Sequence, residues 1–408
     1  MQVLYPRCAG LDVHKDTVVA CVRCVSEPEH HETRSFATTT RELLALGEWI
    51  ASHGCSHVAL EATGVYWRPV WHVLEGQVEL VLANAHHIKN VPGRKTDVND
   101  AMWIADLLAH GLIRSSFVPP QPIQELRDLT RTRKQVVREI SQHSLRIQKV
   151  LEDANIKLGS VLSEVLGVSG RAMLGAIIEG ERDPHKLADL AHGTARRKHD
   201  ALVEALHGHI RPHHCTLLKL HLNLIIALEH TVAEVDAAVG KCLDPIHQRA
   251  RLLTTMPGVR DTVAEVIVAE IGIDMTRFPT PGHLLSWATM CPRNDESAGK
   301  RRSTRLLKGN NWLKTALVTA AWAAVRTKTS YLRAQFLRLK ARRGAKKAII
   351  AVAASMLTAA YFILRDGVPY RDLGPNHFDR QQRGKTVRRL LRRLHDLGYN
   401  LPLQNQPV

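Results

Sequence analysis

The chain has 408 residues, and 56 Lys and Arg against 39 Asp and Glu give it a formal net charge of +17. This length exceeds one typical domain, and a hydrophobic content of 45% is enough to fill two or three cores, which excludes a wholly disordered protein. The N-terminus carries Arg7 and no long apolar run, so it lacks the pattern of a secretory signal and predicts a cytoplasmic protein. Seven scattered cysteines fit reduced thiols rather than a disulfide framework.

The excess positive charge lies in the last quarter of the chain. Residues 1–118 hold 10 basic and 13 acidic side chains, residues 119–293 hold 22 and 20, and residues 294–408 hold 24 and 6. A tract of this sign and density attracts a polyanion and releases its counterions, which makes nucleic acid the predicted partner. Solvated helix faces are the alternative, but such faces usually mix both signs.

The first part of the chain has the pattern of strands alternating with helices. Apolar and β-branched residues flank Asp12 on both sides of an HKD turn, which predicts a hairpin, and a polar strand-like stretch follows. Amphipathic helices are predicted over 41–54, 66–76 and 95–111, with short apolar runs between them. The order βββαβαβα predicts a three-layer α/β domain that ends near Pro119 and Pro120.

Most of the remaining chain has helical periodicity. Residues 123–158 predict a long antiparallel or coiled-coil-like arm, and residues 160–250 predict further helices. Breaks in that second segment are predicted at Gly167, Gly170, Pro184 and the HGHIRPHHC loop. Beyond residue 251, helices are predicted on both sides of Met256–Val259 and over 283–289, 312–326, 331–343 and 346–364.

One helix in this part approaches the length of a membrane span. The uncharged run from Ala348 to Leu364 nears the roughly 17 residues that a span requires. Six of its residues are alanine, and it carries Ser355 and Thr358, so a buried helix is the better interpretation. No membrane association is therefore expected.

The last predicted helix, over residues 384–398, is basic and amphipathic. Its apolar face carries Val387, Leu390, Leu391 and Leu394. Its opposite face carries Arg388, Arg389, Arg392 and Arg393. In a chain of this charge, such a helix suits a phosphate backbone better than a lipid surface.

Four acidic residues stand out for their positions. Asp12 lies within one apolar strand and Glu61 at the end of another, where a buried charge is costly unless it is paired or binds a metal. Asp97 and Asp100 lie three residues apart at the start of a helix and so share one face. Hard oxygen ligands in this arrangement suit Mg²⁺, with Mn²⁺ as an alternative; such ions activate nucleophiles and neutralise charge on a transferring phosphoryl group.

Each of the four acids also has a structural explanation. Asp97 and Asp100 can complement a helix N-terminus capped by Thr96, and Asp12 and Glu61 can pair with a basic neighbour such as Lys15 or an arginine. Taken together, however, a strand Asp, a strand Glu and a helical Asp-x-x-Asp in this order have the layout of an RNase H-like nuclease fold, which favours the metal site.

A basic loop follows residue 291 and contains Ser297 and Ser303. The basic residues around these serines, with one from the next helix, are Lys300, Arg301, Arg302, Arg305, Lys308 and Lys314. A serine hydroxyl is a weak nucleophile that needs a base, a metal or strong stabilisation of the attacked phosphate, and this density of charge supplies the last of these. The spacing alone leaves open that the serines only donate hydrogen bonds to phosphates.

Residues 252–271 have a helix-hairpin-helix pattern around Pro257 and Gly258. In that motif, backbone N–H groups of the second helix point at a DNA phosphate. Arg260 stands where the motif usually repeats glycine, which weakens the argument for close backbone approach but adds a phosphate-seeking side chain. A plain helical packing unit remains the alternative.

A cluster of metal-binding residue types lies between the two halves. It consists of His207, His209, His213, His214 and Cys215. The cluster lacks a second pair at the usual zinc spacing, so a polar loop is favoured over a Zn²⁺ site. The sequence has no GxxxxGK[ST] loop and no GxGxxG fingerprint, which argues against ATP-driven or dinucleotide chemistry.

Several of these motifs resemble a known family. GLDVHKD, LEATGVYW and GRKTDVNDA, which contain the four acids, are similar to the DEDD-motif insertion-sequence transposases, the family that includes the Piv-type DNA invertases. MPGV, AEIG and FPTPGHLLSWATMCPRNDESAGKRR are similar to the C-terminal transposase domain of that family. The resemblance covers about residues 1–118 and 251–372.

The resemblance implies a fold and a mechanism. It implies an α/β, RNase H-like (RuvC-like) domain at 1–120 and a mainly α-helical transposase domain at 251–372. Outside the region of resemblance, the periodicity and charge predict a helical arm and insert at 121–250 and a basic tail at 373–408. The resemblance further implies that Ser297 is the catalytic serine, that serine and Mg²⁺-bound carboxylates meet in one composite site, often across subunits, and that the serine is joined covalently to a DNA end. The expected partners are DNA, a guide noncoding RNA encoded by the element, and further copies of the chain as a dimer or tetramer.

Two other functions remain open at this stage. The acids alone would suffice for a metal-dependent, Holliday-junction-type endonuclease that hydrolyses DNA without a serine intermediate. The second alternative is a structural protein that binds nucleic acid with a nuclease fold that has lost its catalytic activity. The presence of all four acids argues against such a loss.

Overall fold

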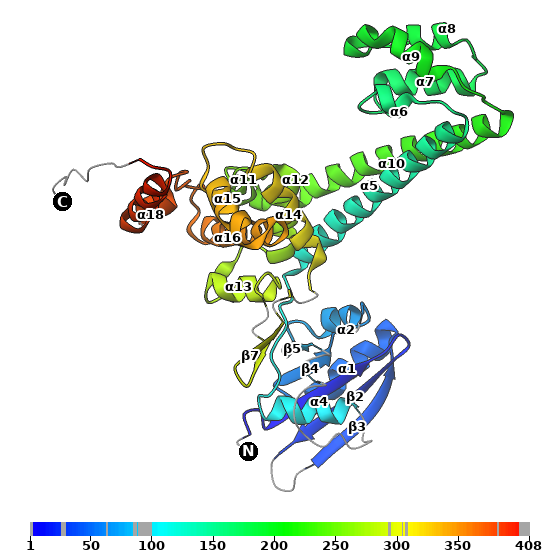
Figure 1. The fold of residues 1–408 in the computed structure, drawn as a ribbon. Coiled ribbons are helices and arrows are strands. Elements are labelled where there is room, and N and C mark those ends of the chain that lie inside the picture. Colours follow the sequence, from blue (N-terminus) through cyan, green and yellow to red (C-terminus); the bar gives the residue numbers. More distant parts are fainter. Residues whose placement is uncertain are drawn as a thin grey trace. The chain divides into compact units, whose positions relative to one another are not determined.

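A computed structural model describes residues 3–25, 30–62, 64–84, 88, 100–292, 295–303, 305–306, 309–381 and 383–399. The chain divides into two compact units, Met1–Val118 and Pro119–Val408 (Figure 1). The first is a mixed α/β domain, and the second is helical apart from one short β-hairpin in the described ranges.

The first unit has the predicted order of strands and helices. Its elements are β1 (Arg7–Val13), β2 (Thr17–Cys24), β3 (His30–Ala37), α1 (Thr40–Ser52), β4 (His57–Glu61), α2 (Trp67–Leu74), β5 (Glu79–Ala83) and α4 (Asp100–Ala109). The five strands form one sheet in the order β3-β2-β1-β4-β5. The pairs β1–β2 and β2–β3 are antiparallel, whereas β1–β4 and β4–β5 are parallel. The predicted α/β architecture of this unit is therefore confirmed.

Helices cover both faces of this sheet. Successive side chains of a strand point to opposite faces, so Ala9, Leu11 and Val13 of β1 pack with α1 and α2 in the larger core cluster. On the other face, Cys8 packs with α4, and its thiol donates a 3.6 Å hydrogen bond to the Ala105 carbonyl. The helices and the sheet thus form three layers.

The second unit begins with two long helices that pack against each other. They are α5 (Gln121–Asp153) and α10 (Pro212–Leu243), which lie side by side in Figure 1. Arg133 pairs with Asp236 and Asp153 with His214, so the two helices run antiparallel. The predicted arm is therefore a helical hairpin.

Short helices join the far ends of this hairpin and share one hydrophobic core with them. They are α6 (Leu158–Val161), α7 (Val168–Ile178), α8 (Pro184–Asp189), the 3₁₀ helix η1 (Gly193–Lys198) and α9 (His199–Leu206). Gly167 precedes α7 and Pro184 begins α8, as predicted. The break predicted at Gly170 is wrong, because Gly170 lies inside α7. A Cβ there would lie 1.9 Å from the Val165 carbonyl oxygen, so the glycine serves close packing rather than helix termination.

The rest of the second unit is a bundle of helices. Its elements are η2 (Asp244–Ile246), α11 (His247–Leu253), α12 (Asp261–Ile271), η3 (Met275–Arg277), α13 (Pro281–Trp287), β6 (Asp295–Ser297), β7 (Lys300–Ser303), α14 (Asn311–Ala324), α15 (Tyr331–Arg343), α16 (Ala345–Asp366), α17 (His377–Gln381) and α18 (Arg383–Asp396). Helices α11 to α16 and α18 lie close to the predicted helices, whereas the 3₁₀ helices η2 and η3 and helix α17 were not predicted.

The apolar helix α16 lies at the centre of this bundle. It packs against α11, α13, α14 and α15, and its Val352, Met356 and Leu357 are fully buried. It is the one helix in the described part of the chain that is long and apolar enough to cross a membrane, but 56% of its most apolar stretch is buried in the protein. Its composition is accounted for by the core, as the sequence predicted.

Candidate functional site

Asp12 and Glu61 lie at the carboxyl ends of two neighbouring parallel strands. Leu11 of β1 is opposite Leu60 of β4, so the next residue of each strand, Asp12 and Glu61, is adjacent to the other across the sheet. Neighbouring strands lie about 4.8 Å apart. Both side chains are partly exposed, and that of Asp12 retains 20% of its accessible surface. Two carboxylates that solvent can reach are thus brought together at one edge of the sheet.

Helix α4 brings a third predicted acid to the same edge. A Cβ at Gly10 would lie 2.2 Å from the Ala101 carbonyl oxygen, whereas Cys8 contacts Ala105, so α4 runs antiparallel to β1 along this face. Asp12 lies beyond Gly10 on the same face, next to the first turn of α4, and Asp100 is the first residue of that turn. Asp97 lies outside the described residues. Three of the four predicted acids therefore gather at one end of the sheet.

Asp12 has a partner that the sequence analysis did not single out. His14 lies two residues further on, and its Nε2 is 3.1 Å from Asp12 Oδ2. The expected basic partners, Lys15 or an arginine, are replaced at Asp12 by this imidazole, whose ring is largely exposed. The D-x-H spacing was the available signal, because residues two apart in an extended strand point to the same face. A titratable group thus stands beside one of the carboxylates.

The donor set of this edge fits Mg²⁺. Carboxylate oxygens are the hard ligands that Mg²⁺ prefers, and it binds through one or two carboxylates while keeping several waters. Asp12 and Glu61 are partly exposed and Asp100 is exposed, so an ion held there would keep room for water or a phosphate oxygen.

Ser297 lies in a β-hairpin rather than in the loop that the sequence analysis described. Strands β6 and β7 pair antiparallel, with Ser297 opposite Lys300 and a bulge between Asp295 and Glu296. The turn consists of Ala298 and Gly299, both with positive φ, 50° and 72°, as in the tight turns of two-residue hairpins. Ser297 is therefore the residue immediately before a tight turn, on a backbone held by strand pairing.

Ser303, the other serine of this segment, has a local role. Its side chain is half-buried, and its Oγ accepts a 3.2 Å hydrogen bond from the Arg305 backbone N–H. This bond shapes the chain where it leaves β7. The hydroxyl of Ser303 is thus already used in a hydrogen bond with the backbone two residues further on.

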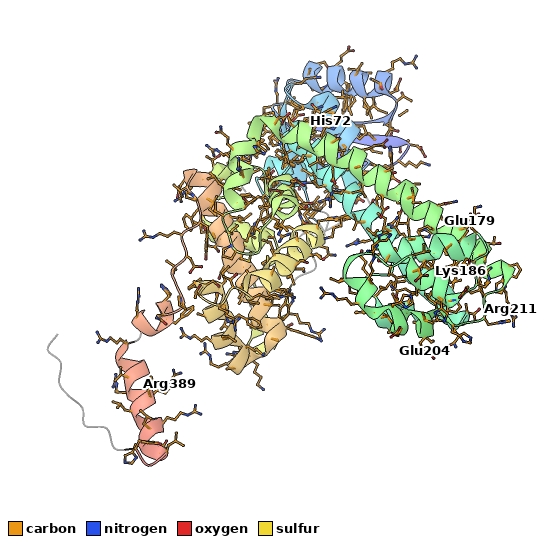
Figure 2. The ribbon with its side chains drawn as sticks, turned by 90° about the horizontal axis from the view of Figure 1, so that it is seen from above. His72, Glu179, Lys186, Glu204, Arg211 and Arg389 are labelled. Carbon is orange, nitrogen blue, oxygen red and sulfur yellow. The ribbon has the colours of Figure 1, made fainter. Side chains whose placement is uncertain are left out.

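The predicted phosphate-binding residues are mostly exposed where the structure describes them. Lys300 and Arg305 are exposed, Lys314 is half-buried in the first turn of α14, and Lys308 lies outside the described residues. Arg301 and Arg302 belong to β7. On the tail helix α18, where Figure 2 labels Arg389, the four predicted arginines are all exposed: Arg388, Arg389, Arg392 and Arg393.

The turn between α11 and α12 requires glycine at residue 258. Gly258 has φ of +81°, and a Cβ on it would lie 2.3 Å from the Ala320 carbonyl oxygen of α14. The glycine is therefore required by the packing of this turn on α14. Arg260 is the exposed N-cap residue of α12 and remains accessible to a ligand.

A buried carboxylate fixes the arm to this bundle. Glu270 of α12 is fully buried and accepts two 2.8 Å hydrogen bonds from the Arg131 guanidinium of α5. It also accepts a 2.6 Å bond from Asn310, whose side-chain oxygen caps α14 by accepting from Trp312 and Leu313. One side chain thus connects α5, α12 and the start of α14.

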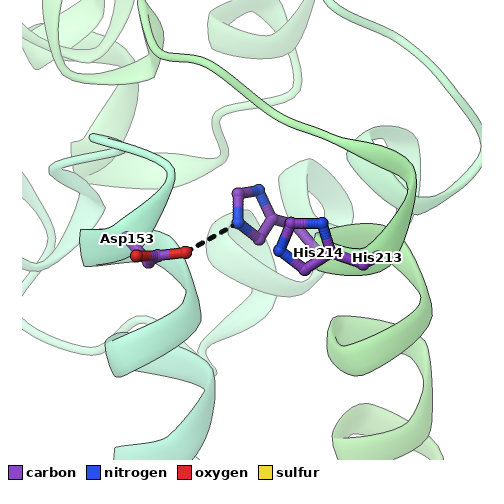
Figure 3. A group of neighbouring side chains, drawn as sticks. All are labelled: Asp153, His213 and His214. Atoms are coloured by element: carbon purple, nitrogen blue, oxygen red, sulfur yellow. Dashed lines mark hydrogen bonds and ion pairs between the residues drawn. The ribbon is translucent and has the colours of Figure 1, made fainter.

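The predicted histidine and cysteine cluster does not converge on one point. His213 and His214 lie together with Asp153, with ligand atoms within 4.8 Å of one another (Figure 3). His214 is buried, its Nδ1 accepts from the Arg211 N–H, and its Nε2 donates to Asp153 Oδ2 at 2.9 Å. Both ring nitrogens are therefore used, which favours the polar structural role over Zn²⁺.

Cys215 points away from these histidines. Its thiol donates to the Ile177 carbonyl and accepts from Arg182 at 3.1 Å, on the side of α7. Cys8 and Cys55 of the first unit are also poor metal ligands, because burial raises the pKa of each thiol to about 12. A thiol with such a pKa remains protonated near neutral pH.

Known protein families match both the acid-bearing and the serine-bearing parts of the chain. Residues 9–156 match a transposase model of the DEDD, IS110 type, and residues 250–337 match the model of the IS116/IS110/IS902 transposase family. The chain belongs to this transposase family. The first match includes Asp12, Glu61 and Asp100, and the second includes Ser297.

Relatives matched over most of their length support the same family. A pilin gene-inverting protein of Moraxella bovis is 23% identical over 373 residues, covering 88% of this chain and 96% of the relative. An uncharacterized 43.6 kDa protein of insertion element IS110 from Streptomyces coelicolor is 27% identical over 306 residues, covering 70% and 74%. Membership of the transposase family implies a recombinase that binds and cuts DNA.

Proposed function

We propose that this transposase cuts and rejoins DNA through a covalent serine–DNA intermediate. Asp12, Glu61, Asp97 and Asp100 would hold Mg²⁺, or Mn²⁺, on an RNase H-like domain, and Ser297 would be the nucleophile. The observation that carries the proposal is the gathering of Asp12, Glu61 and Asp100 at one end of the sheet, in a family of DNA-cutting enzymes. A shared structural role does not readily explain why partly exposed carboxylates gather at one end of a sheet.

The carboxylates would act by positioning and charge. A bound Mg²⁺ would neutralise negative charge on the scissile phosphate. Asp12 and Glu61 sit on paired strands, so their separation is held by the backbone rather than by side-chain flexibility. His14, hydrogen-bonded to Asp12, would hold that carboxylate in one orientation.

Ser297 would exchange one phosphodiester bond for another. Its Oγ attacks phosphorus, the Oγ–P bond forms as the P–O3′ bond breaks, and the 3′-oxygen leaves as a hydroxyl that carries a proton equivalent to the one lost by the serine. Bond energy is conserved, so a DNA 3′-hydroxyl can later reverse the step and rejoin the strands. The strand pairing of Ser297 with Lys300 supports this role, because it fixes the backbone of the nucleophile beside a cation.

Basic residues would bind the nucleic acids. Phosphate contacts are proposed for Arg260, Lys300, Arg301, Arg302, Arg305, Lys308, Lys314, Arg388, Arg389, Arg392 and Arg393. Their partners would be the DNA of the element ends and the target, and a guide noncoding RNA encoded by the element. The protein would act in the cytoplasm as a homo-oligomer, dimer or tetramer. A relative named for inverting a pilin gene supports rejoining as well as cutting.

The test is a search for the covalent adduct. The wild-type protein, incubated with Mg²⁺, guide RNA and DNA of the element ends, should yield a protein–DNA species that survives denaturing electrophoresis. Ser297→Ala should abolish this species while DNA binding persists. Ser303→Ala is the matched control and should retain it, because Ser303 accepts a local backbone bond.

The outcomes also separate the second candidate function. An endonuclease that hydrolyses DNA at the carboxylates alone would still cut after Ser297→Ala and would form no adduct in either protein. An adduct that survives Ser297→Ala would show that another residue is the nucleophile. Asp100→Asn should abolish cutting under both mechanisms, since both depend on the metal.

A further inference from the structure

Three cations of the arm gather on one aromatic ring. Arg131, Lys134 and Arg138 of α5 lie within 5.6, 5.7 and 5.3 Å of the Trp312 ring centroid, at the start of α14. Their spacing of three and four residues puts them on one face of α5. None of them was among the residues expected to bind nucleic acid, because the sequence separates Trp312 from α5 by more than 150 residues.

The three cations around Trp312 carry more positive charge than the facing carboxylate can balance. In the described part of the chain, the carboxylate that acts on Lys134 is Glu270, which is already engaged by Arg131 and Asn310. Burial and the neighbouring Arg138 lower the pKa of Lys134. Arg138 is exposed and Lys134 half-buried, so both heads remain accessible to a ligand. Like charges held over one ring are stabilised by an anion bound between them.

We propose that Lys134 and Arg138, held against Trp312, bind a backbone phosphate of duplex DNA. Trp312 orders the two side chains by cation–π contact, which lowers the entropy lost on binding. Arg131, whose charge is balanced by Glu270, fixes the surroundings of the ring. Trp312 directly follows the basic segment that carries Lys300 and Arg305, so the site would extend a phosphate-binding track from the hairpin onto the arm. The choice of DNA rests on the proposed function.

The experiment measures how DNA binding depends on salt. The double variant Lys134→Gln, Arg138→Gln removes two charges at Trp312. The matched control, Arg146→Gln with Lys149→Gln, removes two exposed charges from the same helix away from the ring. Binding of the full chain to an element-end duplex is titrated between 50 and 200 mM salt in EDTA, so that no cutting occurs. The melting temperature of each variant is measured to verify folding.

Loss of one phosphate contact should make the salt slope less negative by about 0.9, since each neutralised phosphate contributes about 0.9 on B-DNA. The affinity lost across this salt range should then be smaller by about 3.5-fold for the Trp312 variant, with little change for the control. Equal slopes for the wild-type protein and the Trp312 variant, or equal changes in both variants, would overturn the site.

A hairpin RNA of matched length separates the nucleic acids, because an effect confined to RNA would overturn the choice of DNA. The outcome does not depend on the serine mechanism, which the adduct assay tests without reference to the arm. A failed adduct with an altered salt slope would refute the mechanism alone, whereas a normal adduct with an unaltered slope would refute the phosphate site alone.

Discussion

Replacing Glu270 with alanine should destabilise the second unit far more than an exposed substitution. Glu270 is fully buried, and its removal leaves Arg131 and the amide of Asn310 without their acceptor. Breaking a buried pair in this way costs about 3–5 kcal/mol. The Arg131 side chain keeps 29% of its accessible surface and can turn toward water, so about 3 kcal/mol is expected here. For a unit of this size, that corresponds to a fall in Tm of about 6 °C.

The matched control is a second arginine–carboxylate pair of the same arm. Arg133 and Asp236 keep 24% and 45% of their side-chain surface, so Asp236→Ala should cost no more than about 1 kcal/mol. Urea unfolding followed by far-UV circular dichroism measures both variants. Equal losses for Glu270→Ala and Asp236→Ala would refute the argument that burial of Glu270 makes its pair stabilising.

Three further predictions concern other parts of the chain. Gly10→Ala should lower the free energy of unfolding by about 1–3 kcal/mol and impair DNA cutting, because its Cβ would lie 2.2 Å from the backbone of α4. Gly175→Ala, which has open space around it in α7, should be neutral or stabilising, and thermal melting compares the two variants. Stability should fall as pH rises from about 9 to about 12, because the raised pKa of Cys8 and Cys55 keeps both protonated in the folded chain while the unfolded chain ionises them. A Cys8→Ala, Cys55→Ala variant should show a flatter dependence of the urea midpoint on pH. EDTA should leave the melting temperature of the arm unchanged, and a marked fall with EDTA would indicate a metal at Asp153. His214→Ala should lower this melting temperature and His213→Ala should not, because of the two only His214 is buried and caps α10.

The sheet of the first unit was predictable because its signals are local. Alternation of apolar residues around Asp12 and an HKD turn define β1 and β2, and the helices follow from periodicity and terminal glycines. Parallel pairing then brings strand ends together, which is why Asp12 and Glu61 could be matched before the structure was known. The functional role of these acids remains a prediction.

The features that escaped prediction depend on conformation or on distant partners. The hairpin at 295–303 was missed because its turn begins with Ala298, which has little tendency to adopt a positive φ, so the Asn-Gly signal was absent. Gly170 was taken as a helix break, since glycine has poor helix propensity and its close contact with Val165 is not visible in the sequence. The cations around Trp312 come from a helix far away in the chain, and no local pattern joins them.

The glycines of two family motifs have a physical explanation in packing rather than in ligand approach. Gly10 in GLDVHKD admits the backbone of α4 onto β1, and Gly258 in MPGV admits the backbone of α14 onto the turn before α12. In the first case the contact sets the position of Asp100 relative to Asp12, and in the second it sets the N-terminus of α12, where Arg260 is exposed. A substitution at either glycine would therefore disturb the function indirectly, by moving the element that carries the charged residue. This accounts for glycine beside a charged group in both motifs without any contact between the glycine and DNA.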